Sequence, residues 1–189
     1  MFGVLDGHGA ENGALVAKVA SDAIQEHLAA NFGRLRSTSQ SEVELVFTTA
    51  FERAHDAARK AVLAVDPAYT LGAGTVPVDD WEDEDGVTYT DAVDGGTTAT
   101  VIALVDGAKL LHAQVGDSSA LLGGTMRDAD ADAEGEISFE ELMEEHSATN
   151  VAKTAPHTHR QCTFFSGCMR RARFSLTVAR AMCAAGGGI

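Results

Sequence analysis

The sequence predicts an α+β domain in which antiparallel strands follow two amphipathic helices. Apolar residues recur at helical spacing over two long stretches in the first third of the chain. A region rich in Thr, Val and Ile comes later and contains Asp106-Gly107, a dipeptide typical of tight hairpin turns. Helices followed by consecutive hairpin strands favour an antiparallel sheet over a series of parallel β-α-β units. Two amphipathic helices in succession also need a common surface to cover.

The chain opens with a short apolar run, Phe2 to Leu5, that stops at Asp6-Gly7-His8-Gly9. The run has the character of a buried strand. The glycines permit positive φ angles or close approach of a ligand to the backbone. At the end of a strand, an aspartate can hold a hard cation and a histidine can transfer a proton. These residues alone fit a catalytic corner and a plain Asp-Gly turn equally well.

Two helices are predicted next. The first spans about residues 13–30, with Asn12 as its N-cap. The second spans about residues 41–65 and stops before Asp66-Pro67, because proline cannot continue a helix. Ser39 and Ser41 each have a glutamate three residues later, which is the pattern of a capping box.

Residues 66–94 are rich in glycine and acidic residues and contain neither Lys nor Arg. This composition favours a solvated loop, with a calcium- or protein-binding acidic loop as the alternative. Strands are then expected over Thr97–Val105, Lys109–Val115 and Ser118–Leu122, which together predict an antiparallel meander.

Composition narrows the class of protein. The chain has 189 residues, enough for one domain with a core. A formal net charge of −14 argues against nucleic-acid and anionic-membrane partners. We expect no transmembrane helix, no signal peptide and a monomeric protein. The three cysteines, all in the last 30 residues, favour reduced thiols in an intracellular protein of the cytoplasm or nucleus.

Three separated segments carry a family resemblance: residues 2–9 (FGVLDGHG), 94–101 (DGGTTATV) and 111–120 (LHAQVGDSSA). In order and spacing they resemble the metal-dependent serine/threonine protein phosphatases of the PPM, or type 2C, family. A weaker fourth segment, residues 142–147, is similar to the family's Leu-Thr-x-Asp-His segment. We therefore expect residues 1–150 to be a partial phosphatase domain with an acidic loop insertion at 66–94. Residues 151–189 are expected to be an unmatched, basic and poorly ordered tail.

The resemblance implies a fold and an activity. The fold is an αββα sandwich, here a partial one, with two antiparallel β-sheets flanked by antiparallel helices. The activity is hydrolysis of phosphoserine and phosphothreonine in a phosphoprotein substrate, at a two-metal site that uses Mg²⁺ or Mn²⁺. Carboxylates suit these hard cations, and two metals can polarise a phosphoryl group and activate a water.

The resemblance also implies roles for individual residues. Asp6 is similar to the carboxylate that bridges both metals, and Gly7 would offer its backbone carbonyl to one of them. His8 would be the general acid that protonates the departing alkoxide. Asp117 matches an acidic position associated with a further metal. Four other polar residues of these segments are expected to be structural: Thr97, Thr98, His112 and His146.

The sequence departs from the family pattern at both ends. The family's strand before the first motif, with a phosphate-binding arginine and an acidic pair, has no counterpart. The later Asp-Gly-hydrophobic-Trp motif and the C-terminal aspartate are also missing after residue 150, and Ala10 replaces a glycine. We therefore expect an incomplete fragment or gene model that is inactive by itself. A pseudophosphatase-like interaction protein is the non-catalytic alternative.

Residues 130–141 (DADAEGEISFEE) fit the EF-hand calcium loop as a local string. The candidate Ca²⁺ ligands are Asp130, Asp132, Glu134, Glu136, Ser138 and Glu141. The context fits less well, because an EF-hand needs an entering helix and residues 118–125 read as a strand with a Gly-Gly pair. A calcium-binding interaction protein and a plain acidic surface loop both remain open.

The last 39 residues contain six of the 14 basic residues and none of the 28 acidic ones. Their His and Cys residues do not have a standard zinc-site spacing. Residues 170–173 (RRAR) form either a small basic patch or part of a solvated tail. A short helix is expected over residues 175–183.

Overall fold

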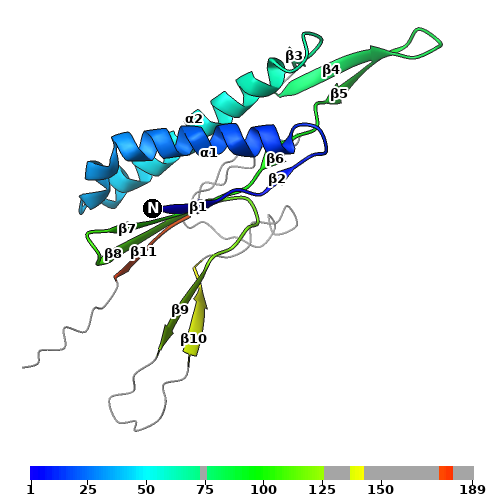
Figure 1. Cartoon of the computed structure of the whole chain (residues 1–189). Coiled ribbons are helices and arrows are strands. Elements are labelled where there is room, and N and C mark those ends of the chain that lie inside the picture. Colours follow the sequence, from blue (N-terminus) through cyan, green and yellow to red (C-terminus); the bar gives the residue numbers. More distant parts are fainter. Residues whose placement is uncertain (73–75, 126–136, 143–174, 181–189) are drawn as a thin grey trace, which may run out of the picture.

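The computed structural model describes residues 1–72, 76–125, 137–142 and 175–180. Two long helices, α1 (Gly13–Ala30) and α2 (Gln40–Leu63), lie side by side over one face of an antiparallel sheet (Figure 1). The predicted α+β class is confirmed, and this helix layer on a sheet is the arrangement of one half of a sandwich. None of the helices in the described ranges is both long and apolar enough to cross a membrane.

The main sheet has four strands. In spatial order they are β1 (Phe2–Val4), β7 (Ala99–Val105), β8 (Lys109–Val115) and β11 (Ser175–Arg180).

Both long helices begin and end close to the predicted positions. Ser39 is the cap of α2, and its Oγ accepts a hydrogen bond from the backbone N–H of Glu42 at 3.4 Å. Asn12 does occupy the N-cap position of α1, but its side chain makes no capping hydrogen bond.

A short 3₁₀ helix, η1 (Phe32–Arg36), connects α1 to α2 and was not predicted. It is fastened to the β7–β8 turn, because the Arg36 guanidinium donates to the Asp106 carboxylate at 2.9–3.0 Å. Lys109 Nζ also donates to the backbone carbonyl oxygens of Leu35 and Ser37, at 3.2 and 2.9 Å. The Arg36–Asp106 pair is more than half exposed, so it contributes little stability by itself.

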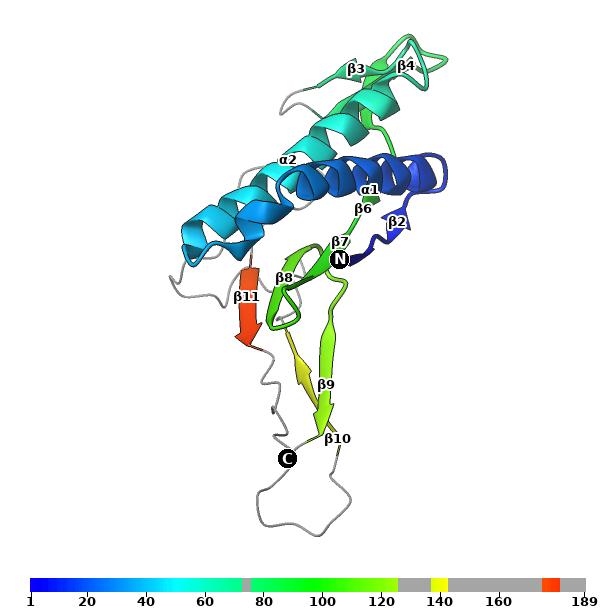
Figure 2. The ribbon, with the colours of Figure 1, turned by 60° about the vertical axis from the view of Figure 1, so that its left-hand side comes forward.

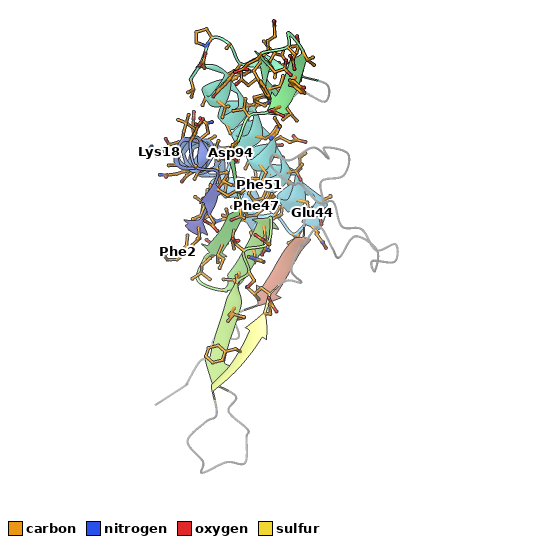
Figure 3. The ribbon with its side chains drawn as sticks, turned by 90° about the vertical axis from the view of Figure 1, so that its right-hand side faces the viewer. Phe2, Lys18, Glu44, Phe47, Phe51 and Asp94 are labelled. Carbon is orange, nitrogen blue, oxygen red and sulfur yellow. The ribbon has the colours of Figure 1, made fainter. Side chains whose placement is uncertain are left out.

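The core lies between the two helices and the sheet. Alternate residues of β7 and β8 face the helices and are buried: Ala99, Val101, Ala103, Val105, Leu111, Ala113 and Val115. Phe47 and Phe51 of α2 pack against this face and are 1% exposed (Figure 3). The apolar residues repeated at helical spacing in α1 and α2 and those alternating along β7 and β8 therefore pack into one core.

The expectation of a buried strand at Phe2 to Leu5 is half right. Residues 2–4 form β1, but Phe2 is 75% exposed and Val4 is 67% exposed. Their partners across the ladder are Ile102 and Thr100, which belong to the sheet face opposite the helices. Because side chains alternate along a strand, only Gly3 of β1 points to the helix side.

The predicted meander is right for two strands and wrong for the third. The β7–β8 hairpin turns at Asp106-Gly107, with positive φ angles of 52° and 69°, as a type I′ turn requires. The third strand is β9 (Leu121–Thr125), which pairs with β10 (Ile137–Glu141) instead of β8. The chain leaves the sheet at Gly116, whose φ is +98°, and β11 pairs with the edge of β8 that a meander would have used.

The short helix expected over residues 175–183 is also wrong, because residues 175–180 form strand β11. β11 is antiparallel to β8 and pairs with every residue of β8 except the last, Val115. The pairs run from Ser175 opposite Gln114 to Arg180 opposite Lys109. Thr177 and Val178 are β-branched and suit a strand. These residues favour a strand locally, and the edge of β8 supplies the backbone partner that makes the segment one.

The acidic segment 66–94 is not an irregular loop. It contains β3 (Thr70–Leu71), β4 (Pro77–Glu82) and β5 (Thr88–Ala92), which form a separate three-stranded sheet. The β4–β5 hairpin projects beyond the C-terminal end of α2 (Figure 2). The β-branched and aromatic residues of β4 and β5 (Val78, Trp81, Thr88, Tyr89 and Thr90) supply the strand propensity that the acidic composition hid.

Buried histidines are expected to make the fold weaker in mild acid. His112 on β8 is fully buried, and neither ring nitrogen has a hydrogen-bond partner among the described residues. Burial lowers the pKa of His112, and burial first and nearby arginines second lower the pKa values of His27 and His55. The unfolded chain then binds protons at a higher pH than the folded one, so the free energy of unfolding falls as pH drops below about 6.5.

Urea unfolding at about pH 7.5 and about pH 5.5 measures this effect. We expect the parent protein to lose stability between the two pH values. His112→Leu should lose less, because the buried imidazole is gone. Some loss should remain in that variant, because His27 and His55 still titrate. Equal losses in the parent and in His112→Leu would contradict the assignment of the effect to His112.

Candidate catalytic corner at Asp6–His8

The first motif continues from β1 into a second short strand. β2 (Gly7–His8) pairs with β6 (Gly96–Thr97), with Gly7 opposite Thr97 and His8 opposite Gly96. Between the two ladders, the backbone N–H of Thr98 donates to the Asp6 carbonyl at 2.9 Å. The backbone N–H of Asp6 donates to Thr98 Oγ1 at 3.2 Å. The Asp6 main chain is therefore held on both sides, and its side chain is exposed.

Thr98 joins all three motifs. Its Oγ1 lies 2.7 Å from Ser118 Oγ, and the neighbouring Thr100 Oγ1 donates to the Ser118 carbonyl at 2.9 Å. Gly116 packs so closely on Thr98 that a Cβ there would lie 2.7 Å from Thr98 Cγ2. Thr98 is structural, as expected, and its hydroxyl is the point at which residues 6 and 118 meet. Asp117 lies between Gly116 and Ser118 and is exposed.

The His8 imidazole packs across Gly96. A Cβ at Gly96 would overlap the Cε1 and Nε2 atoms of the ring, so any larger residue there would displace the imidazole. Gly96 itself is buried, and the His8 side chain is exposed. Pairing of β2 with β6 fixes the backbone of His8. Because Gly96 has no side chain, the His8 imidazole can lie directly against it.

The loop after His8 is held by Asp94. The Asp94 carboxylate accepts a hydrogen bond from the backbone N–H of Ala10 at 2.9 Å. Its backbone carbonyl accepts one from Asn12 Nδ2 at 2.8 Å, so the Asn12 side chain bonds to this loop and makes no capping hydrogen bond to α1. Figure 3 shows Asp94 beside the start of α1. Asn12 was expected only as a cap and Asp94 only as part of a motif, because a pairing across 82–84 residues leaves no local signal.

Gly7 lies against the first turn of α1. A Cβ at Gly7 would overlap the carbonyl oxygen of Gly13 and lie 2.9 Å from its carbonyl carbon and 3.0 Å from Ala17 Cβ. Gly7 and Gly13 therefore allow the backbones of β2 and α1 to come into contact. The corner is built from β2, β6, the segment after β8 and the N-terminal end of α1.

A protein-family model described as Protein phosphatase 2C matches residues 1–182. The chain belongs to the protein phosphatase 2C family. The resemblance drawn from the three motifs is thus confirmed, and the match runs past residue 150 to include strand β11. No curated protein matches the sequence. The family is one of metal-dependent protein phosphatases, so a phosphatase-type function follows from membership.

Hard cations such as Mg²⁺ and Mn²⁺ prefer oxygen ligands, which the carboxylates of this chain can supply. Asp6 and Asp117 present exposed carboxylates, and no hydrogen bond or ion pair ties the Asp6 carboxylate to another described residue. Within the described ranges, however, no group of three or more His, Cys, Asp or Glu side chains is gathered as a metal site. The assignment of Asp6, Gly7 and Asp117 as metal ligands stays a prediction.

The EF-hand candidate of this phosphatase-family chain is only partly described. Asp130, Asp132, Glu134 and Glu136 lie outside the described residues, as does His146. Ser138 and Glu141 lie on β10, which is paired with β9. The strand β9 precedes the candidate loop in sequence, at the place where an EF-hand has its entering helix. Calcium binding by residues 130–141 stays a prediction.

Proposed function

We propose that this chain is a protein serine/threonine phosphatase of the 2C family in which Asp6, Gly7 and Asp117 are metal ligands and His8 is the general acid. Mg²⁺ or Mn²⁺ is the implied cofactor, and phosphoserine or phosphothreonine in a protein is the implied substrate. The observation that supports this best is the meeting of the three motifs at Thr98, within a chain whose family match spans residues 1–182.

The proposed role of His8 follows from chemistry that its position allows. A serine or threonine alkoxide is a poor leaving group, so its departure needs a proton from a nearby acid. The exposed imidazole, seated on Gly96, can meet a substrate from solvent without any rearrangement of the core. Asp6 is two residues away, with its main chain clamped by Thr98 and its carboxylate turned to solvent.

The proposal includes a low activity for the isolated chain. The described carboxylates do not form a group of three or more, whereas a two-metal centre needs several oxygen ligands for each cation. We therefore expect the purified 189-residue chain to hydrolyse phosphopeptides at a rate close to background.

The test is an assay on a phosphothreonine peptide with millimolar Mn²⁺, with Mn²⁺ binding followed in parallel by electron paramagnetic resonance. Asp6→Asn removes the proposed ligand. Asp22→Asn is the matched control, because Asp22 is an exposed carboxylate of α1 that pairs with Lys18. We expect little turnover in any of the three proteins, and weaker Mn²⁺ binding in Asp6→Asn alone.

Two outcomes would contradict parts of the proposal. Robust turnover that is lost in Asp6→Asn would contradict the expected low activity of the chain and would establish a catalytic role for Asp6. Mn²⁺ binding that is the same in Asp6→Asn and in the parent would remove Asp6 as a ligand. That second result would favour the pseudophosphatase-like interaction protein instead.

A further inference from the structure

The β4–β5 hairpin presents an exposed aromatic pair. Trp81 lies directly opposite Tyr89 in the ladder, and their rings stack with centroids 4.6 Å apart and planes 20° apart. Trp81 is 46% exposed and Tyr89 is 42% exposed. Aromatic rings of this size are usually covered by other side chains, so a stacked pair left in solvent is typical of binding surfaces.

Carboxylates flank the aromatic pair on the same face. Asp79 lies directly opposite Asp91, and both are two residues from the aromatic pair, so all four side chains share one side of the hairpin. We call this surface, made of Asp79, Trp81, Tyr89 and Asp91, the Trp81 face. Trp81 Nε1 donates to Asp91 Oδ2 at 2.8 Å, which fixes the indole against a carboxylate.

No basic side chain in the described part of the chain pairs with these carboxylates. Residues 66–94 contain no Lys or Arg, and none of the ion pairs within the described ranges involves the hairpin. Like charges directly opposite each other in a ladder are destabilising. Burial first, and then the charges of Glu11, Asp66 and Asp79, raise the pKa of Tyr69 at the base of the hairpin, which indicates a negative potential there. Among the residues that the structure describes, none therefore places a cation on the Trp81 face to offset its charge.

Hydrogen bonds within the hairpin fix its turn. At its turn, the backbone N–H groups of Asp85 and Val87 donate to Asp83 Oδ1 at 3.0 and 2.9 Å. Gly86 occupies the left-handed region with φ +78°, and its N–H donates to the Asp83 carbonyl at 3.0 Å. A surface that is already ordered loses little entropy when a ligand binds.

We propose that the Trp81 face is a docking surface for an arginine-rich segment of a partner protein. A planar guanidinium can stack on the exposed indole while its N–H groups donate to the carboxylates of Asp79 and Asp91. Arginine suits both contacts better than lysine, because an ammonium group lacks the flat face and the paired donors. The charge of the face and the aromatic stack thus select the same side chain.

The surface is also close in sequence to the catalytic corner. β5 ends at Ala92, and Asp94, two residues later, holds the loop after His8 through Ala10. A phosphoprotein docked by a basic segment would be held on the same chain as Asp6–His8; this consequence rests on the proposed function, whereas the binding itself does not.

The test uses peptide binding without phosphate chemistry. Trp81 is the single tryptophan of the chain, so intrinsic fluorescence reports on this face alone. A fluorescein-labelled nonapeptide rich in Arg is titrated by anisotropy, with Lys-rich and Gln-rich peptides of equal length beside it. We expect saturable binding of the Arg peptide with a change in Trp81 emission, weaker binding of the Lys peptide and none of the Gln peptide.

Asp79→Asn/Asp91→Asn removes both charges but keeps an acceptor for the indole N–H and keeps the fluorescent probe. It is expected to weaken Arg-peptide binding about tenfold or more. The control Glu26→Gln/Glu52→Gln removes two exposed carboxylates from the helices and should bind like the parent. Circular dichroism checks that both variants are folded.

Several results would overturn the proposal. They are no binding of the Arg peptide, equal affinity in the parent and in Asp79→Asn/Asp91→Asn, or equal weakening in the control variant. Displacement of the peptide by micromolar Ca²⁺ or Mg²⁺ would assign the face to a metal ion instead. Phosphatase activity enters none of these readouts, so this proposal can fail while the proposed function stands.

Discussion

Phe47→Ala is expected to lower the free energy of unfolding by about 3–5 kcal/mol, the range for truncating a fully buried phenylalanine. Phe47 is 1% exposed and packs from α2 into the core shared by both helices and the sheet (Figure 3). The alanine would leave a cavity that the surrounding helix and strands cannot close without moving. Urea unfolding followed by circular dichroism measures the change.

Leu45→Ala is the matched control for this experiment. Leu45 is two residues away on the same helix but is 55% exposed. Its truncation is expected to change stability by no more than about 0.5–1 kcal/mol, as for most surface substitutions. Similar losses in the two variants would mean that α2 does not pack with the Phe47 side against the sheet.

Gly7→Ala is expected to cost about 3 kcal/mol of stability, at the upper end of the range for overpacking. The added methyl group would overlap the Gly13 carbonyl, which is backbone at the start of α1 and cannot rotate away as a side chain can. Either β2 separates from β6 or the helix shifts, so the Asp6–His8 corner would also lose its geometry. Urea unfolding gives the stability, and chemical shifts of residues 6–8 and 96–98 report on the corner.

Gly33→Ala controls for the added methyl group. Gly33 lies in η1, and a Cβ there would meet no atom within 4 Å. This substitution is expected to be neutral or to stabilise the protein by about 0.5 kcal/mol, since alanine restricts the unfolded chain. A neutral Gly7→Ala would show that β2 and α1 are not in backbone contact.

The elements that were predicted well depend on neighbours in sequence. Both long helices follow from apolar residues repeated every three or four positions, and Ser39 marks the start of α2 by its own hydrogen bond. The β7–β8 hairpin follows from Asp106-Gly107, where both residues adopt positive φ. A side chain that must be buried within one helix or one hairpin leaves a periodic pattern that is readable without knowing the rest of the fold.

The misjudged elements depend on which strands pair with each other. β11 is a strand because β8 offers an edge more than 60 residues earlier, and β9 leaves the meander because β10 pairs with it. The acidic hairpin is ordered by cross-strand contacts such as Trp81 with Tyr89, which composition obscured. In each case the pairing of one strand with another decides the structure, and a short window of sequence does not show that pairing.

The sequence by itself determined the family and the α+β class and predicted Asp6, His8 and Asp117 as site residues, because motif order and spacing are properties of the chain alone. Only the tertiary structure decided how those residues are held. The bond from Asp6 to Thr98 spans 92 positions, and the one from Ala10 to Asp94 spans 84. No local pattern encodes such contacts, because they depend on how two helices and a hairpin return the chain to its beginning.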